Sequence, residues 1–456
     1  IPNFIFNFSP TIRKPNQAMS NSTPLSTTGA SKVEPASNTA ASTAPIDVLC
    51  MGCSDECCDF KPIKLKRRNI GDYDVQIEMK YCGVCHSDLH IAAGHIGLGK
   101  VTYPCVPGHE LAGVAVAVGA QVTKFKVGDH VGVGCMVDSC LKCKNCRAGE
   151  EQKCSKQVAT YAGKDNGSGR AQTYPANTQT IGGYSTVQIV HERFGILIPA
   201  DYPLEYAGPV MCAGVTMYDP LRRQKAKEKK SRVGIVGLGG LGVMGVKLAR
   251  ALGCEVTVIS RSASKKDFAL NECGATSFLH STDPTQMKDN AGKLDLILNT
   301  IPVNHPFHKY GTLLSSKGKQ VILGLHPGLG GAFLVDILTC GHSKHIGSGI
   351  GSIQCTQEVI DLCHEFNIRP EIEVRPCSDL NEIYSILDSN NDKGIRYVLD
   401  IANTLKDQNE KEVTVVIEDT QPPPPPPPTI KDVKKKLTLC NILGSCCTLL
   451  CCCRWC

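Results

Sequence analysis

A glycine-rich stretch at residues 233–260, VGIVGLGGLGVMGVKLARALGCEVTVIS, restricts the fold more than any other part of the sequence. Its apolar run at 233–236 predicts a strand, and the apolar-periodic segment that ends near Gly253 predicts a helix. A second apolar run at 255–260 predicts another strand. This order of strand, glycine-rich turn, helix and strand is typical of a parallel α/β sheet.

The turn between the first strand and the helix has the pattern G-x-G-x-x-G, with one more glycine inside it. In this context the pattern predicts a dinucleotide site, because glycine allows a tight turn and lets the backbone approach a pyrophosphate. The free N–H groups at the start of the helix are expected to face the phosphates. The candidate cofactor residues of the turn are Gly237, Gly239, Gly240 and Gly242.

The end of the second predicted strand, ISRSASKK, indicates which dinucleotide binds. An NAD site usually carries an Asp or Glu here to accept from the adenosine ribose, and this segment has no acidic residue. Hydroxyl and cationic donors suit a 2′-phosphate instead, so we expect NADP to be preferred over NAD. The alternative is a solvated basic turn that does not discriminate between them. The residues concerned are Ser260, Arg261, Ser262 and Lys265.

The part of the chain before residue 212 has the pattern of an antiparallel β region. The segment DVQIEMKYCG at 74–83 alternates apolar and polar residues, and residues 110–133 read as short valine-rich strands broken by Gly and Asp. With 456 residues the chain has room for two cores. We therefore expect an α/β protein with a tail at 1–45, a β domain at 46–211, a parallel-sheet domain at 212–350, and a linker and tail at 404–456.

Both ends of the chain differ from the core in composition. Residues 20–45 are rich in Ser, Thr, Ala and Pro and are expected to be disordered, with an organelle transit peptide as the alternative. Near the other end, QPPPPPPP at 421–428 predicts an extended spacer, and a cysteine-rich terminus follows Lys434, Lys435 and Lys436. Such a terminus suits S-acylation and membrane tethering, while soft-metal binding and a non-native end are the alternatives.

The composition of the chain indicates the cellular compartment of the protein and limits the kinds of partner that it binds. The 26 cysteines are clustered rather than spread as in a disulfide scaffold, which favours metal-bound thiolates in a reducing compartment, so we expect the cytoplasm. No apolar run approaches the roughly 20 residues that span a bilayer, and a soluble core is expected. The net charge of +6 is modest, and the densest basic run, at 222–232, holds no aromatic residue for base stacking. We therefore expect no nucleic-acid partner.

Four cysteines in SCLKCKNCRAGEEQKC have a spacing that is specific for a metal site. They follow one another at offsets of three, three and eight residues. Four thiolates arranged as a tetrahedron close the coordination sphere of zinc, and such a site stabilises the fold without taking part in a reaction. The predicted ligands of this structural zinc are Cys140, Cys143, Cys146 and Cys154.

The stretch YCGVCHSDLHIAAGHIGLGKVTYPCVPGHE at 81–110 is a second candidate metal site. A catalytic zinc ion usually has three protein ligands of mixed Cys, His and carboxylate type and keeps one position open. Cys85 and the pair His109 and Glu110 supply two or three such ligands, so a further thiolate must come from elsewhere. A buried cysteine and a satisfied core histidine are the alternative, and these residues alone do not decide between the two.

Several long motifs occur together and in order, namely CGVCHSDLH, YPCVPGHE, VGVGCMVDSC and MCAGVTMYDPL. With them the chain resembles the zinc-dependent medium-chain dehydrogenase/reductases, and specifically the cinnamyl alcohol dehydrogenase-like branch of NADPH-dependent aldehyde reductases. The resemblance covers residues 46–403. It implies a GroES-like antiparallel β catalytic domain at 46–211 that is completed by 351–403, a doubly wound Rossmann domain for NADP, two zinc ions per chain and a homodimer.

The resemblance also implies roles for single residues. Cys85, His109 and Cys212 match the three positions that hold the catalytic zinc, and Glu110 matches a glutamate that approaches the metal when substrate is absent. The other cysteines of this region, such as Cys135, match no ligand position and are expected to be structural.

The implied reaction is hydride transfer between NADPH and an aldehyde, or its reverse from a primary alcohol, with zinc as the Lewis acid. The family's proton path corresponds here to Ser87 and His90, because a hydroxyl can both donate and accept and an imidazole exchanges protons near neutrality. Thr216, one helical turn after the last zinc ligand, corresponds to a nicotinamide contact.

One departure from the branch bears on the substrate. Its members commonly carry a tryptophan a few residues before YP, whereas this chain reads HIGLGKVTYP and its only tryptophan is Trp455. We therefore expect a broad aldehyde and alcohol range rather than a strict preference for cinnamaldehydes. The rival readings are an NAD-linked polyol dehydrogenase of the same superfamily and a non-enzymatic zinc or redox-sensor protein on this fold.

Overall fold

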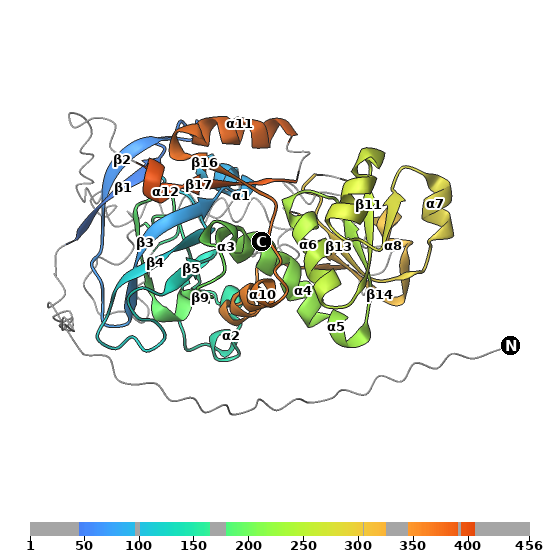
Figure 1. Ribbon diagram of the computed structural model, residues 1–456, viewed down its shortest axis with the longest axis horizontal. Coiled ribbons are helices and arrows are strands. Elements are labelled where there is room, and N and C mark those ends of the chain that lie inside the picture. The colour runs from blue at the N-terminus through green and yellow to red at the C-terminus, as the bar shows by residue number, and fades with distance from the viewer. Residues whose placement is uncertain are drawn as a thin grey trace, which may run out of the picture. The chain divides into compact units, whose positions relative to one another are not determined.

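The computed structural model describes residues 45–95, 101–164, 179–303, 305–324, 345–390 and 394–405. A six-stranded sheet, whose strands are all parallel, has the order β12-β11-β10-β13-β14-β15 (Figure 1). Counted along the chain this order is 3-2-1-4-5-6, the arrangement of doubly wound dinucleotide-binding folds. The strands are β10 (Arg232–Val236), β11 (Glu255–Ser260), β12 (Ser277–His280), β13 (Leu294–Asn299), β14 (Leu314–Ile322) and β15 (His345–Gly347).

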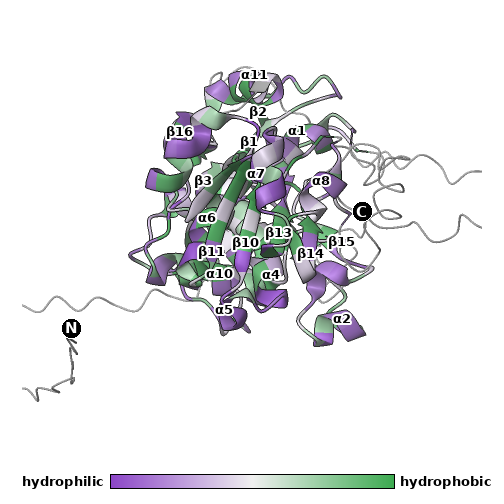
Figure 2. Ribbon diagram, turned by 90° about the vertical axis from the view of Figure 1, so that its right-hand side faces the viewer, coloured by the Kyte–Doolittle hydropathy of each residue, from purple (hydrophilic) through white to green (hydrophobic). Residues whose placement is uncertain are grey.

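Helices connect these parallel strands, as a parallel sheet requires. The best defined of them is α6 (Gly240–Ala251), whose apolar residues Val243, Val246 and Ala249 are fully buried where α6 packs against β10 and β11. Figure 2 shows that the strands of the parallel sheet are mostly hydrophobic and are drawn green. The short helices α2 (Lys144–Arg147) and α5 (Ala226–Lys229) are mostly hydrophilic and are drawn purple. The other helices of this part are α7 (Pro284–Asp289) and α8 (Phe307–Gly311).

A seven-stranded sheet forms the other part of the fold. Its order is β16-β17-β3-β4-β5-β9, with β8 also paired to β3, and every pair except the parallel β16 and β17 is antiparallel. The central strand alternates as its sequence predicts, since Val75, Ile77 and Met79 are buried. The strands are β3 (Asp74–Gly83), β4 (Leu111–Val118), β5 (His130–Val133), β8 (Val187–His191), β9 (Ile196–Ile198), β16 (Ile372–Pro376) and β17 (Arg396–Asp400).

Smaller elements border this sheet. β1 (Ile46–Gly52) and β2 (Lys61–Arg67) form an antiparallel hairpin, and β6 (Met136–Asp138) pairs with β7 (Val158–Ala159). The helix α1 (His86–Ala92) follows β3, and α11 (Leu380–Asn390) lies against α1.

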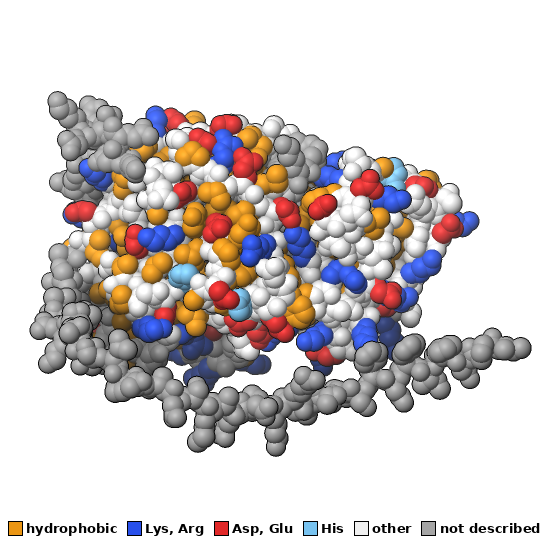
Figure 3. Space-filling view, in the orientation of Figure 1, with side chains coloured by type: hydrophobic (Ala, Val, Ile, Leu, Met, Phe, Trp, Pro, Cys, Tyr) orange, Lys and Arg blue, Asp and Glu red, His pale blue; other side chains and the backbone are white. Residues whose placement is uncertain are grey.

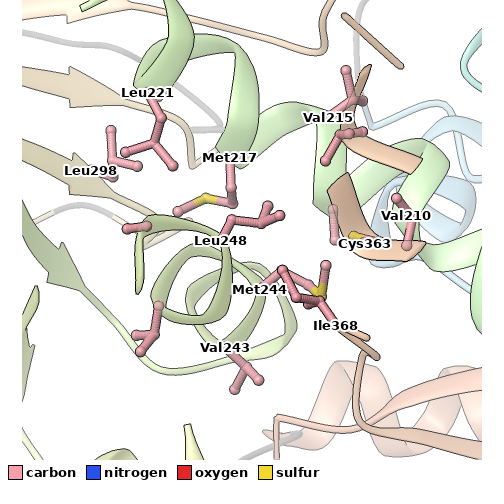
Figure 4. Close-up of a cluster of buried hydrophobic side chains, with 14 of the residues drawn as sticks. Val210, Val215, Met217, Leu221, Val243, Met244, Leu248, Leu298, Cys363 and Ile368 are labelled. Atoms are coloured by element: carbon pink, nitrogen blue, oxygen red, sulfur yellow. The ribbon is translucent and has the colours of Figure 1, made fainter. Parts of the chain in front are cut away.

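One helical run contributes side chains to a core that includes residues of both sheets. It consists of α3 (Leu204–Pro209), a π-helical turn η3 (Val210–Gly214) and α4 (Val215–Arg223). Its buried residues join strand residues such as Ile198 and Ile235 in one apolar cluster, and α10 (Ile353–Glu365) packs on it. Figure 4 shows Met217 of α4 beside Leu248 of α6, at the heart of this cluster.

The predicted parallel α/β unit and the predicted antiparallel region are therefore confirmed. β17 pairs with β3 from the first part of the chain, and β16 pairs with β17. The proposed domain boundaries stay predictions, because the described residues belong to one compact unit and the run from α3 to α4 passes through residue 212.

Three other predictions concern the ends of the chain, membrane-spanning helices and the charge of the surface. The predicted disordered tail, up to residue 44, and the proline-rich spacer and cysteine-rich terminus lie outside the described residues. Within the described ranges, no helix is long and apolar enough to cross a membrane. On the face drawn in Figure 3, basic and acidic side chains lie interspersed, in keeping with the modest net charge.

Candidate active site

The residues predicted to bind a catalytic metal come together from three separate segments. Cys85 caps the N-terminus of α1, His109 and Glu110 directly precede β4, and Cys212 lies in the π-helical turn η3. All four are buried, and their ligand atoms lie within 4.8 Å of one another. His109 Nε2 and Cys212 Sγ are 3.2 Å apart. Two sulfurs, one imidazole and a carboxylate are the donor set that zinc prefers, so the residues fit this metal.

The pKa values of the two thiols of this site are shifted in opposite directions. Contact with Cys212 is the largest influence on Cys85 and holds its pKa well below the ordinary thiol value, although burial acts in the other direction. The pKa of Cys212 is raised, chiefly by its contacts with Cys135 and Cys85 and by burial. The close packing of these thiols therefore favours a thiolate at Cys85, the form in which cysteine binds metals.

The buried carboxylate of Asp88 organises the site. Asp88 Oδ1 is 2.8 Å from His109 Nδ1, and the carboxylate also accepts from the backbone N–H groups of Cys85, at 3.0 Å, and Gly108, at 3.1 Å. The hydroxyl of Tyr184 donates to Asp88 Oδ2 at 3.0 Å. Because Nδ1 is occupied in this way, Nε2 of His109 is left to face the two sulfurs and a metal.

Asp88→Asn is expected to reduce the affinity of this site for zinc about 10- to 100-fold, the usual loss when the partner of a ligating histidine is changed. The amide keeps the shape of the carboxylate but removes the charge and one acceptor, so the tautomer of His109 is no longer fixed. Zinc titration with a competing chelator measures this. Tyr184→Phe is the control, because it removes only one donor to Asp88 and should shift the affinity far less.

The buried carboxylate of Glu110 is a second indication of a metal site. Its side chain is 0% exposed, and neither carboxylate oxygen has a hydrogen-bond partner among the described residues. Burial raises the pKa of Glu110 to about 7, against the lowering influence of Arg396. Arg396 Nη2 lies 3.4 Å from Glu110 Oε1, and Arg396 Nη1 donates to the carbonyl of Val84 at 3.3 Å. A buried carboxylate with unused oxygen atoms is costly unless it serves a cation.

Sequence reasoning gave Asp88 only a general part in shaping the site, and it missed Arg396 and the contact of Cys135. A carboxylate three residues after a cysteine ligand at a helix start was a usable signal for the specific contact of Asp88 with His109. Cys135, which was expected to be structural, contacts Cys212 through its side chain. It does not belong to the set of close metal-ligand atoms, so its predicted lack of a ligand role is not contradicted.

The four predicted structural ligands also lie together. The ligand atoms of Cys140, Cys143, Cys146 and Cys154 are within 4.8 Å of one another. The Sγ of Cys146 is 3.5 Å from that of Cys143 and 3.9 Å from that of Cys140. The edge of a tetrahedron of sulfurs around zinc is about 3.8 Å, so little movement is needed to hold the ion. Backbone N–H groups also donate to Cys140, which lowers its pKa to about 6.

The glycine-rich turn has the geometry that its sequence predicts. Gly237 follows β10 with φ of +89°, which favours glycine, and Gly239 caps α6. A side chain at Gly242 would place its Cβ only 2.1 Å from the carbonyl oxygen of Gly237, so the turn and the helix can approach only without one. Gly240 is the first residue of α6, where free N–H groups suit a pyrophosphate.

The basic segment after β11 lies beside this turn. Lys265 Nζ donates to the carbonyl of Leu238 inside the glycine-rich turn at 3.3 Å. Ser260 ends β11 and accepts from the N–H of Ser262 at 3.2 Å, and Arg261 is exposed between them. The segment that was expected to distinguish NADP from NAD is thus adjacent to the expected phosphate site.

The residues of the implied proton path lie on α1. Ser87 and His90 are both partly exposed there. The His90 ring stacks on that of His86 with centroids 4.4 Å apart, and its Nδ1 is 3.4 Å from His95 Nδ1. Burial and the neighbouring histidines lower the pKa of His90, so its neutral form is favoured. Thr216 is buried in the first turn of α4, four residues after Cys212.

Comparison with known proteins agrees with this architecture. Residues 71–200 match the alcohol dehydrogenase GroES-like domain family, and residues 240–365 match the zinc-binding dehydrogenase family. Vomilenine reductase of Rauvolfia serpentina is 43% identical over 347 residues, covering 76% of this chain and 93% of that protein. 8-Hydroxygeraniol dehydrogenase of Catharanthus roseus is 41% identical over 362 residues, covering 79% and 97%.

Solved structures of cinnamyl alcohol dehydrogenases have the same fold. The enzyme from Sorghum bicolor superposes with a TM-score of 0.72 at 38% identity, covering 79% of this chain and 99% of that one. CAD from Helicobacter pylori in complex with NADP(H) gives a TM-score of 0.70 at 36% identity, covering 79% and 100%. Each of these two structures matches 79% of this chain. The chain therefore belongs to the zinc-dependent alcohol dehydrogenases, in the cinnamyl alcohol dehydrogenase-like branch.

Proposed function

We propose that the protein is an NADP(H)-dependent zinc alcohol dehydrogenase that interconverts aldehydes and primary alcohols by hydride transfer. The observation that carries this proposal is the buried set of Cys85, His109, Glu110 and Cys212 with ligand atoms within 4.8 Å of one another. A structural metal site needs no orienting carboxylate and no spare buried acid, whereas this set has both Asp88 and Glu110.

Each residue of the site has a part in this reaction. Cys85, His109 and Cys212 hold zinc, which when bound supplies Lewis acidity toward a carbonyl oxygen. Asp88 keeps Nε2 of His109 directed at the metal position. Glu110 is a spare carboxylate close enough to compete for the same position, and Arg396 restrains it. The spare acid and its arginine therefore set how readily the position opens for substrate.

The cofactor and the proton path complete the proposal. The turn from Gly237 to Gly242 would hold the pyrophosphate, and the buried Thr216 would lie beside the nicotinamide. Ser87 and His90, both on α1, carry a proton between the reacting oxygen and solvent. The lowered pKa of His90 favours its neutral form, in which one ring nitrogen can accept a proton while the other donates one.

Arg261→Ala is expected to raise the KM for NADPH about tenfold and to leave the KM for NADH unchanged, because a charge-assisted hydrogen bond contributes about 1.5–3 kcal/mol. Arg261 is exposed at the end of β11, where the 2′-phosphate of NADPH is expected. Steady-state kinetics with both cofactors test this. Lys266→Ala, an exposed neighbour, is the matched control and should change neither KM.

The proposed substrate range rests on the names of the relatives and on one departure of this sequence from the branch. Proteins that are 41–43% identical to this chain are named for a vomilenine, a cinnamyl alcohol and an 8-hydroxygeraniol substrate, which differ widely in shape. The chain also lacks the tryptophan common before YP. We infer a broad range of aldehydes and alcohols rather than one aromatic substrate.

The direct test is a set of initial rates for the full-length, zinc-loaded protein with aromatic and aliphatic aldehydes, using NADPH and NADH in parallel. Aldehyde-dependent oxidation of NADPH, much faster than that of NADH, is the expected result. Oxidation of NADH alone would favour the NAD-linked polyol dehydrogenase. A folded sample with two zinc ions that consumes neither cofactor would favour the sensor protein.

The organisation of the chain is part of the same proposal. Residues 46–211 and 351–403 form the catalytic domain, residues 212–350 form the cofactor domain, and the outer segments 1–45 and 404–456 are tails. The family resemblance supports a homodimer and a place in the cytoplasm. Tethering through the cysteine-rich terminus would add membrane association, which fractionation of cells that express the full chain would reveal.

A further inference from the structure

A group of three cysteines outside both metal sets lies at the edge of the β1–β2 hairpin. Cys53 directly follows β1 and stands opposite Cys105 in an isolated antiparallel bridge. The two residues exchange both backbone hydrogen bonds, from the N–H of Cys53 at 3.0 Å and from the N–H of Cys105 at 2.9 Å. Opposed residues of this type have Cα atoms about 5.5 Å apart, which is inside the range that a disulfide bridges.

Cys58 reaches the same sulfur from the hairpin loop. It adopts φ of +57°, and its N–H donates to the carbonyl of Asp55 at 3.3 Å, so the loop turns back toward β1. The Cys58 side chain is in hydrogen-bonding contact with that of Cys53, which also contacts Cys105. Cys53 is therefore the shared member of two thiol contacts. We call Cys53, Cys58 and Cys105 the Cys53 triad.

Two observations separate the triad from a further metal site and from random thiols. Among the described residues, only the two zinc sets have three or more ligand atoms that all lie within 4.8 Å of one another. Exposure is graded within the triad, since Cys105 is 0% and Cys53 1% exposed while Cys58 is partly exposed. A reagent from solvent can thus reach Cys58 but not the two sulfurs behind it.

We propose that the Cys53 triad is a thiol–disulfide site, in which Cys58 reacts first and Cys53 belongs to every disulfide that forms. The oxidant is the disulfide of a small thiol, such as oxidised glutathione. The Cys58 sulfur attacks it, its S–S bond breaks, one glutathione thiol leaves, and a mixed disulfide forms. The Cys53 sulfur then attacks Cys58 and expels the second glutathione. Two protein thiols are oxidised to one disulfide, and the oxidant is reduced to two thiols.

Cys105 gives the disulfide a second position. Its sulfur can attack Cys53 and release Cys58, with no net oxidation or reduction. The product then links the end of β1 to the segment that runs from Cys105 to His109, four residues further on. An oxidised thiol pool would therefore produce a Cys53–Cys105 disulfide, and this bond would lie beside the segment that carries the zinc ligand His109.

The surroundings make this a slow exchange rather than a fast peroxide sensor. Hydrogen bonding to Cys105 raises the pKa of Cys53 to about 12, and contact with Cys53 and burial raise the pKa of Cys58. Asp55 adds to both shifts, Glu56 offers its carbonyl to Cys58, and Tyr103 lies close by. Because only the thiolate attacks, the rate of oxidation is expected to rise with pH across the range from 7 to 9.

The test uses the full-length, zinc-loaded protein treated with oxidised glutathione at pH 8.5, followed by acid quenching, alkylation, digestion without reductant and mass mapping. One disulfide per chain that joins Cys53 to Cys58 or Cys105 is expected, with the zinc content unchanged. Absence of any such disulfide overturns the proposal, and so does oxidation confined to the zinc ligands.

Two single variants sharpen this result. Cys57 is exposed and next to Cys58 in the chain, but the side-chain hydrogen bond that influences its thiol is with Asp55 rather than with a triad sulfur. Cys57→Ser should therefore oxidise at the same rate as the native protein. Cys58→Ser should oxidise at least about tenfold more slowly, because the remaining pair is buried. If exposure alone governed the reaction, Cys57→Ser would be the slow variant and the assignment to the triad would be wrong.

Discussion

Cys85→Ser is expected to lower kcat by more than about 100-fold, since even the partners of zinc ligands are commonly worth 10- to 100-fold. Serine keeps the size of the side chain, but its hydroxyl does not ionise near neutral pH and is a poor ligand for zinc. The Sγ that is lost is the one whose pKa the site lowers most clearly. Zinc content should fall from two ions to one per chain, as measured by metal analysis, because the set that contains Cys140 is untouched.

Measurement of cofactor binding distinguishes loss of the catalytic zinc in Cys85→Ser from loss of the folded structure. The glycine-rich turn follows β10 of the parallel sheet, whereas Cys85 caps α1, and substitutions at sites that share no partner usually add within about 0.3–0.5 kcal/mol. The dissociation constant for NADPH should therefore change by no more than about twofold. Cys254→Ser is the matched control, because this buried cysteine donates to the carbonyl of Ala226, a bond that a hydroxyl can replace. Full activity of Cys85→Ser would exclude the proposed metal centre.

The regular elements of the fold were predictable because local pattern and final environment agree. Residues 74–83 were expected to form a half-buried strand and form β3 with the same bounds, and residues 255–260 form β11 as expected. Alternation and apolar runs reflect burial directly. The pairing of β17 with β3 joins residues more than 300 positions apart, and no local pattern specifies such a pair. That part of the sheet followed only from resemblance to a family.

The candidate site was predictable in its ligands and not in what surrounds them. Cysteine and histidine at metal spacing are chemically distinctive, so Cys140 and its partners could be named from spacing alone. Cys212 could not, because it lies over 100 residues from the other ligands and was assigned by motif. Asp88, Arg396 and Cys135 act through contacts made in three dimensions, and a carboxylate or guanidinium on a strand or helix more often faces solvent.

The buried pair of Arg396 and Glu110 has the largest expected effect on stability. Arg396→Met is expected to lower the free energy of unfolding by about 3–5 kcal/mol, because it leaves a buried carboxylate without its cation. Methionine fills most of the volume, so the loss is electrostatic rather than a cavity. Urea unfolding followed by far-UV circular dichroism measures it, since the only tryptophan, Trp455, lies outside the described core.

A second substitution distinguishes loss of charge pairing from loss of packing. In the Arg396→Met background, Glu110→Gln removes the unpaired charge and should recover about 1–3 kcal/mol, the range of coupling for contacting residues. If packing were the cause, the double variant would be no more stable than Arg396→Met alone. Arg232→Met is the matched control, because Arg232 pairs with Asp295 at 2.8 Å but both side chains are over one-third exposed, so its cost should stay below about 1 kcal/mol. An equal loss of unfolding free energy in Arg232→Met would show that an exposed ion pair stabilises this protein as much as the buried pair. The stability of Arg396→Met would then give no support to the role of Glu110 at the metal site.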